Sequence, residues 1–268
     1  RDEVVPVLAA AVTVRDVPVI RDGIGNVQAF AAITVKPQVD GRLLSVEFRE
    51  GQDVKKGDVL ARIDPAIYQA QFDQALAKKA QDEANLANAR LDLDRYQKLA
   101  STNAGSKQQA DSQKAQVAQL EAQLRADQAA IDNAKVYLDY TTVRAPIDGR
   151  TGLRLIDAGS IVRASDASGL VSIAQVKPIA AVFTLPQRDF RLVSEAMARG
   201  PVNVAALDSD GRSALAKGRL EVVDNQMDST TGTFKLKAVF PNEDQKLWPG
   251  QFVSVRVEVQ LLSRVVTI

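Results

Sequence analysis

The side chains that most often carry out chemistry in enzymes are missing from this chain. Its 268 residues include no histidine and no cysteine, which removes the commonest general base, the thiolate nucleophile and two preferred ligands of zinc and copper. We also find no glycine-rich loop of the kind that binds nucleotide phosphates. We therefore expect a protein that is not an enzyme and that uses neither a metal ion nor a cofactor.

The charged side chains are numerous but balanced. The chain has 34 basic and 33 acidic residues, a net charge of +1, and no run of lysine or arginine longer than a pair. Proteins that bind nucleic acids need a basic patch or stripe. The composition therefore argues against that class, while 46% apolar residues are ordinary for a folded protein.

Two stretches of the chain resemble each other at a spacing of 108 residues. Residues 35–54 read VKPQVDGRLLSVEFREGQDV, and residues 143–162 read VRAPIDGRTGLRLIDAGSIV. Apolar residues flanking glycine turns are typical of short strands, and shared turn chemistry alone is the alternative explanation. We expect two halves of one small β-sandwich that pack on each other, with Gly41 and Gly149 in turns that need a positive φ angle.

The segment between the repeats has a helical composition. Residues 66–139 contain 18 alanines and 12 glutamines among 74 residues, with no proline and one glycine, Gly105. Steps of alternately four and three residues, from Tyr68 and again from Ala110, fall mostly on apolar residues, which is the seam of a coiled coil. The seam is interrupted by polar residues, namely Lys79, Asp82, Gln113 and Asp127.

The turn between the two predicted helices has its own signals. Gly105 is expected to end the first helix, and Ser106 with Gln109 three residues later is expected to cap the second. The sequence therefore predicts an antiparallel coiled-coil hairpin of about 50 Å, inserted between the two halves of the sandwich.

Strand patterns dominate the remainder of the chain. After residue 172, apolar runs alternate with glycine-rich turns, and one short helix is predicted within residues 186–200. Together with a strand in residues 12–34, this pattern predicts a β-barrel. The apolar run at residues 4–14 is too short to cross a membrane, and because the chain begins with Arg1 we expect it to be part of a longer protein.

Four motifs in this order resemble the periplasmic adaptor proteins, or membrane fusion proteins, of the HlyD superfamily, in the branch that serves RND-type multidrug efflux pumps. The motifs are GRLLSVEFREGQDVKKGDVLARID, YTTVRAPIDGRTGL, VDNQMDSTTGTFKLKAVFPN and LWPGQFVSVRVEV. The resemblance implies an elongated multidomain fold of mixed α and β structure, with a β-barrel, a lipoyl-like barrel-sandwich hybrid and a long α-helical hairpin.

The resemblance also implies domain boundaries. We expect a remnant of a membrane-proximal domain at 1–11, a β-barrel from 12–34 and 172–258, a lipoyl-like domain from 35–65 and 140–171, the hairpin at 66–139, and the start of a truncated membrane-proximal domain at 259–268.

A docking site at the hairpin tip is implied as well. Adaptors of this branch carry an arginine, a leucine four positions on and a serine seven beyond it, which dock to the outer-membrane channel. Arg95, Leu99 and Ser106 stand at that spacing. The alternative is that Leu99 closes the coiled coil, Arg95 is solvated and Ser106 is only a cap.

The implied partners are an inner-membrane RND transporter, an outer-membrane channel and further copies of the chain, with a hexamer in the pump. The implied location is the periplasm, attached to the inner membrane by a lipid or anchor. An adaptor for an ABC exporter or type I secretion system remains the alternative. A lipoyl or biotinyl carrier is disfavoured because helices replace the modifiable lysine turn, and soft-metal export because the chain has two methionines and no histidine.

Overall fold

The computed structural model describes residues 12–102, 104–208, 211 and 213–267. The chain divides into two compact units, one of Arg1–Ile33, Asp148–Arg150 and Ile173–Ile268, the other of Thr34–Ile147 and Thr151–Ser172. We describe each by itself. The remnant domain expected at residues 1–11 lies outside the described residues.

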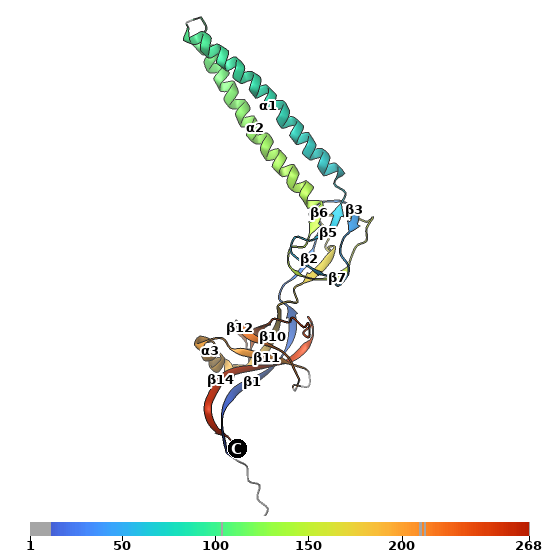
Figure 1. Cartoon of the computed structure of the whole chain (residues 1–268), viewed down its shortest axis with the longest axis vertical. Coiled ribbons are helices and arrows are strands. Elements are labelled where there is room, and N and C mark those ends of the chain that lie inside the picture. Colours follow the sequence, from blue (N-terminus) through green and yellow to red (C-terminus); the bar gives the residue numbers. More distant parts are fainter. Residues whose placement is uncertain (1–11, 103, 209–210, 212, 268) are drawn as a thin grey trace, which may run out of the picture. The chain divides into compact units, whose positions relative to one another are not determined.

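A closed barrel forms the centre of the first unit (Figure 1). Around it the strands follow the order β1, β10, β13, β12, β11, β14, and neighbouring strands run antiparallel. The strands are β1 (Thr13–Ala29), β10 (Ile179–Pro186), β11 (Asn203–Leu207), β12 (Ala214–Asp228), β13 (Thr233–Phe240) and β14 (Phe252–Thr267). The predicted short helix is α3 (Phe190–Arg199), which follows the 3₁₀ helix η1 (Gln187–Asp189).

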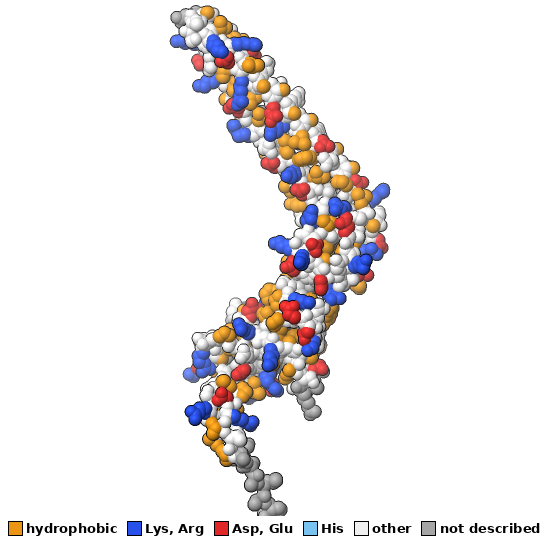
Figure 2. All heavy atoms as spheres, viewed as in Figure 1, with side chains coloured by type: hydrophobic (Ala, Val, Ile, Leu, Met, Phe, Trp, Pro, Cys, Tyr) orange, Lys and Arg blue, Asp and Glu red, His pale blue; other side chains and the backbone are white. Residues whose placement is uncertain are grey.

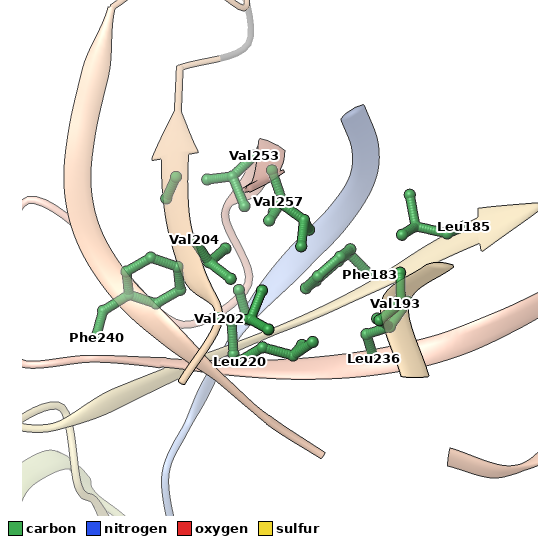
Figure 3. Close-up of a cluster of buried hydrophobic side chains, with 14 of the residues drawn as sticks. Phe183, Leu185, Val193, Val202, Val204, Leu220, Leu236, Phe240, Val253 and Val257 are labelled. Carbon is green, nitrogen blue, oxygen red and sulfur yellow. The ribbon is translucent and has the colours of Figure 1, made fainter. Parts of the chain in front are cut away.

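The core of this barrel is built from large apolar side chains at alternate positions of its strands. On β13, Phe234, Leu236 and Phe240 are at most 1% exposed, as expected when every second side chain points inward. Phe183 of β10 and Val193 of α3 belong to the same cluster (Figure 3). The helix thus adds its apolar face to the core of the barrel.

Two four-stranded sheets contain the repeated segments. Their orders are β2, β9, β7, β4 and β6, β5, β3, β8. The strands are β2 (Ala32–Val35), β3 (Gly41–Val46), β4 (Asp53–Val54), β5 (Val59–Ile63), β6 (Thr142–Arg144), β7 (Gly149–Arg154), β8 (Ile161–Val162) and β9 (Val171–Ala174). Each sheet therefore takes strands from both copies of the repeat.

Matching backbone hydrogen bonds join the two copies. The Gly51 N–H donates to the Thr151 carbonyl over 3.1 Å, and the Gly159 N–H donates to the Leu43 carbonyl over 2.7 Å. These four positions are equivalent at the 108-residue spacing. The equivalent valines are also buried, namely Val35 and Val143, and Val54 and Val162. The prediction that the two halves pack on each other is confirmed.

The conformation expected of Gly41 and Gly149 was wrong. Neither has a positive φ; the positive angles belong to the other equivalent pair, Gly51 at 71° and Gly159 at 94°. Gly41 and Gly149 are close-packed instead: an added Cβ would lie 2.6 Å from Cγ2 of Ile63 or 2.7 Å from the Ala174 carbonyl oxygen, respectively. These two glycines are required by space and not by turn geometry.

The predicted hairpin is formed by α1 (Ala66–Ser101) and α2 (Lys107–Tyr140), which lie side by side (Figure 1). The buried residues of the two helices are Asp82, Leu86, Ala89, Val117, Asp127 and Ile131. All six fall on the predicted 3.5-residue seam, so the coiled-coil prediction is confirmed. A helix of 36 residues, the length of α1, spans about 54 Å.

The turn between the helices differs in detail from the prediction. Helix α1 ends at Ser101 and not at Gly105, because the hydroxyls of Ser101 and Thr102 donate to the Lys98 carbonyl at 2.7 and 3.3 Å and offer the chain another partner. Ser106 occupies the N-cap position of α2 as predicted, but its side chain makes no capping hydrogen bond.

Within the described part of the chain, no helix combines the length and the apolar character needed to cross a membrane.

Candidate docking site at the hairpin tip

The three residues predicted to dock are placed around the turn between α1 and α2. Arg95 and Leu99 lie in the last two turns of α1, and Ser106 directly precedes α2. Residues four apart on a helix share one face, so the structure brings Arg95 and Leu99 together on one side of α1. Ser106 lies across the turn from them.

Arg95 is exposed at this end of the helix. Its side chain is 71% exposed, and Nη1 donates one hydrogen bond to Oδ1 of Asp92 over 3.1 Å. A guanidinium group has five N–H donors in a planar fork. An exposed ion pair of this kind contributes little stability, so Arg95 can exchange Asp92 for another acceptor at low cost.

Leu99 is half exposed and is held in place by the turn. An added Cβ on Gly105 would lie 2.9 Å from Cβ of Leu99, and the Ala104 N–H donates to the Leu99 carbonyl over 3.0 Å. The turn therefore packs against one side of Leu99, while 46% of the residue faces solvent. Gly105 matters here because a larger residue would displace Leu99, which the sequence interpretation missed by treating Gly105 as a helix end.

Ser106 presents a hydroxyl group at the same end of the hairpin. The residue is exposed, and its side chain makes no hydrogen bond that caps α2. A serine hydroxyl can both donate and accept a hydrogen bond. The expectation that Ser106 only caps the helix is not supported.

Charges of both signs surround these residues. Lys98 Nζ lies 2.6 Å from Oδ2 of Asp94. This ion pair is next to the pair of Arg95 with Asp92 on the same helix. Figure 2 shows basic and acidic side chains interspersed near the free end of the hairpin. The surface is suited to polar contacts around one apolar side chain, which is the usual make-up of a protein–protein contact.

Among the residues that the structure describes, no three histidine, cysteine, aspartate or glutamate side chains are grouped so that they could hold a metal ion.

Comparisons with known proteins place both parts of this chain in one family. The β-barrel domain of RND MFPs, the membrane fusion proteins, matches residues 178–261, and the barrel-sandwich hybrid domain of RND MFPs matches residues 31–174. Multidrug resistance protein MdtA of Photorhabdus laumondii is 46% identical over 264 residues, which are 98% of this chain and 66% of that protein. The chain spans 60 to 66% of the length of such relatives.

Solved structures share the fold. A MacA–MexA chimera with the Pseudomonas aeruginosa MexA α-hairpin domain has a TM-score of 0.63 at 24% identity. The match covers 96% of this chain and 87% of the chimera. The membrane fusion protein Spr0693 of Streptococcus pneumoniae has a TM-score of 0.67 at 18% identity. The match covers 92% of this chain and 100% of the Spr0693 chain. The predicted mixture of barrel, sandwich and hairpin is confirmed, and with two domain families matched in order along the sequence, the chain belongs to the RND membrane fusion proteins.

Proposed function

We propose that this chain is the adaptor of a multidrug efflux pump and joins an inner-membrane RND transporter to an outer-membrane channel. Membership of the RND membrane fusion proteins supports this role. The observation that carries it is the hairpin tip, where Leu99 is half exposed beside the exposed Arg95 and Ser106. A leucine kept partly in solvent at the free end of a two-helix arm is suited to contact with another protein.

The adaptor acts in the periplasm at the inner membrane, and several copies, six in the assembled pump, surround the exported molecule. A single two-helix hairpin cannot enclose a channel, whereas hairpins side by side can. The role requires no catalysis, because the transporter supplies the energy from an ion gradient.

Docking at the tip follows from the chemistry of its three side chains. Arg95 donates paired hydrogen bonds to backbone carbonyls or carboxylates at the end of the channel protein. Leu99 buries its exposed side against an apolar surface, and the Ser106 hydroxyl satisfies a polar group at the rim of the contact. The ion pair of Arg95 with Asp92 opens when the channel binds.

Drug resistance in cells tests the site. In a strain that lacks its own copy, Arg95→Asp and Leu99→Ser in the full-length protein should lower resistance to the level of the empty strain, with normal protein amounts. The matched controls are Arg125→Asp and Leu91→Ser, which alter exposed positions of the same helices and should retain resistance. Full resistance with both tip variants would overturn the assignment.

A cross-linking experiment tests the partner directly. Since the chain has no cysteine, Ser106→Cys introduces a single thiol at the tip, and a bifunctional reagent should join it to an outer-membrane channel protein in cells. A cysteine at exposed Arg191 on α3 should not give that product. Purification of the cross-linked complex with an ABC exporter instead of an RND transporter would favour the alternative system.

A further inference from the structure

Two aspartates face each other in the seam of the hairpin. Asp82 of α1 and Asp127 of α2 are 4% and 6% exposed, and both residues occupy seam positions on facing sides of the hairpin. The contact of Lys79 with Gln128 (2.8 Å) joins the helices next to this pair, so the two carboxyl groups meet where a coiled coil ordinarily places apolar side chains.

The neighbouring side chains stabilise one negative charge better than two. Lys78 Nζ lies 3.0 Å from Oδ2 of Asp82, but the lysine side chain is 53% exposed, so solvent weakens its attraction. Asn85 donates to Oδ1 of Asp82 over 3.2 Å, and Gln123 donates to Oδ1 of Asp127 over 3.1 Å. These are all neutral or half-solvated donors.

One oxygen of each carboxyl group remains without a hydrogen-bond donor. Oδ2 of Asp82 and Oδ2 of Asp127 are both buried and have no hydrogen-bond partner among the described residues. The other nearby charges are already engaged, because Lys79 pairs with Glu83 at 3.6 Å and Arg90 of α1 pairs with Glu121 of α2 at 2.7 Å. The turn of the seam beyond the pair is apolar, with Leu86 and Leu124 in one cluster.

Two buried carboxylates on facing sides of one seam cannot both stay ionised in such surroundings, because like charges repel and burial penalises each charge. Hydrogen bonding from Lys78, opposed by burial, holds the pKa of Asp82 below its ordinary value, and the hydrogen bond from Asn85 acts in the same direction. Two ionised carboxylates are both acceptors and cannot satisfy each other, whereas one proton between them provides a donor.

We propose that Asp82 and Asp127 share one proton across the seam and that loss of this proton loosens the hairpin. The shared proton supplies the donor that the two buried oxygens lack and removes one of two neighbouring charges. This device depends on the hairpin alone and does not rest on the proposed adaptor function.

The sign of the pH effect follows from proton counting. In the unfolded chain both aspartates are ionised above about pH 5, whereas the closed hairpin retains one proton. The folded state then binds more protons than the unfolded state, so stability falls as the pH rises until the pair releases its proton. Within that window, the equilibrium constant for opening rises about tenfold per pH unit.

Hydrogen exchange on the intact 268-residue chain measures this opening. After correction for intrinsic exchange rates, amides of α1 and α2 beside the pair should open at least tenfold more readily at pH 8 than at pH 5. In Asp127→Asn, whose amide donates without titrating, that dependence should vanish, and opening at pH 8 should be at least tenfold rarer than in the wild type. The matched control Asp94→Asn changes an exposed aspartate of α1 and should behave as the wild type.

Carbon-13 NMR of the aspartate carboxyl groups gives a second readout that does not depend on folding of a variant. At pH 6, one carboxyl resonance of the pair, identified because it disappears or changes in Asp127→Asn, should have the shift of a protonated acid. Two carboxylate shifts at pH 6, together with opening that does not change between pH 5 and pH 8, would overturn the proposal.

Discussion

In the barrel, four alternate positions of β13 are buried, namely Phe234, Leu236, Ala238 and Phe240. By contrast, each helix of the hairpin buries only three residues along its whole length. One of the three is an aspartate in both helices. Each seam side chain therefore has few apolar neighbours, and burial per residue is small. The barrel is stabilised by burial of many large side chains in one core, whereas the hairpin is stabilised by contacts along one narrow seam. Truncation of a buried side chain should therefore act differently in the two regions.

The largest effect is expected in the barrel core. Phe240→Ala removes a side chain that is 0% exposed and should lower the free energy of unfolding by about 4 kcal/mol. Trp248, the single tryptophan of the chain, lies in the same unit. Its fluorescence reports the unfolding transition of this unit in denaturant. Phe252→Ala, at a 73% exposed position, is the control, and an equal loss in both variants would refute the description of the core.

A seam substitution should act locally. Leu86→Ala should destabilise the hairpin by about 2 kcal/mol, at the low end for a buried leucine because the seam has few neighbours to lose. Helical circular dichroism should show a lower transition midpoint while the Trp248 transition stays unchanged. Leu91→Ala, at a 59% exposed position on the same helix, should leave both transitions in place; a shift of the Trp248 signal in Leu86→Ala would contradict the local effect.

Two glycines of the second half-motif distinguish lack of space from backbone strain. Gly149→Ala should cost about 2 kcal/mol, because the new methyl group would press on a backbone carbonyl that cannot move freely. Gly159→Ala should cost about 1 kcal/mol, since its positive φ is unfavourable for alanine but the space around it is open. Thermal unfolding of the two variants gives the order, and a larger loss for Gly159→Ala would reverse our interpretation.

The smallest expected effect is a pH dependence at the turn between β12 and β13. Backbone hydrogen bonds from Thr230 and Thr231 hold the pKa of Asp228 below its ordinary value. Their contribution is present above about pH 4 and is lost as the pH falls through the lowered pKa. Exchange of these two amides, corrected for intrinsic rates, should increase between pH 5 and pH 2, and Asp228→Asn should remove the change.

Several features of the hairpin follow from local rules and were predictable. A repeat of four and three residues needs only helix geometry, so all six buried positions fell on the predicted seam. The end of α1 was missed by a few residues, because the hydroxyls of Ser101 and Thr102 compete for backbone carbonyls. The likeness of residues 35–54 and 143–162 predicted that the halves would pack on each other. It did not predict that each of the two sheets would contain strands from both halves.

The candidate site was only partly accessible to sequence reasoning. The spacing of Arg95, Leu99 and Ser106 was matched through a family resemblance, and their docking role stays a prediction. The contact of Gly105 with Leu99 carries no sequence signal, because it depends on how the chain crosses between the helices.

The amino-acid order alone settled the helical seam, the paired half-motifs and the absence of histidine and cysteine chemistry, because periodicity, repetition and composition are properties of neighbouring residues. Packing in three dimensions decided that Gly41 and Gly149 lack space for a side chain and that Asp82 and Asp127 each keep a buried oxygen without a donor. Both outcomes depend on which residue of a distant segment lies opposite, and the register between segments is fixed only when the whole fold buries its apolar surfaces together.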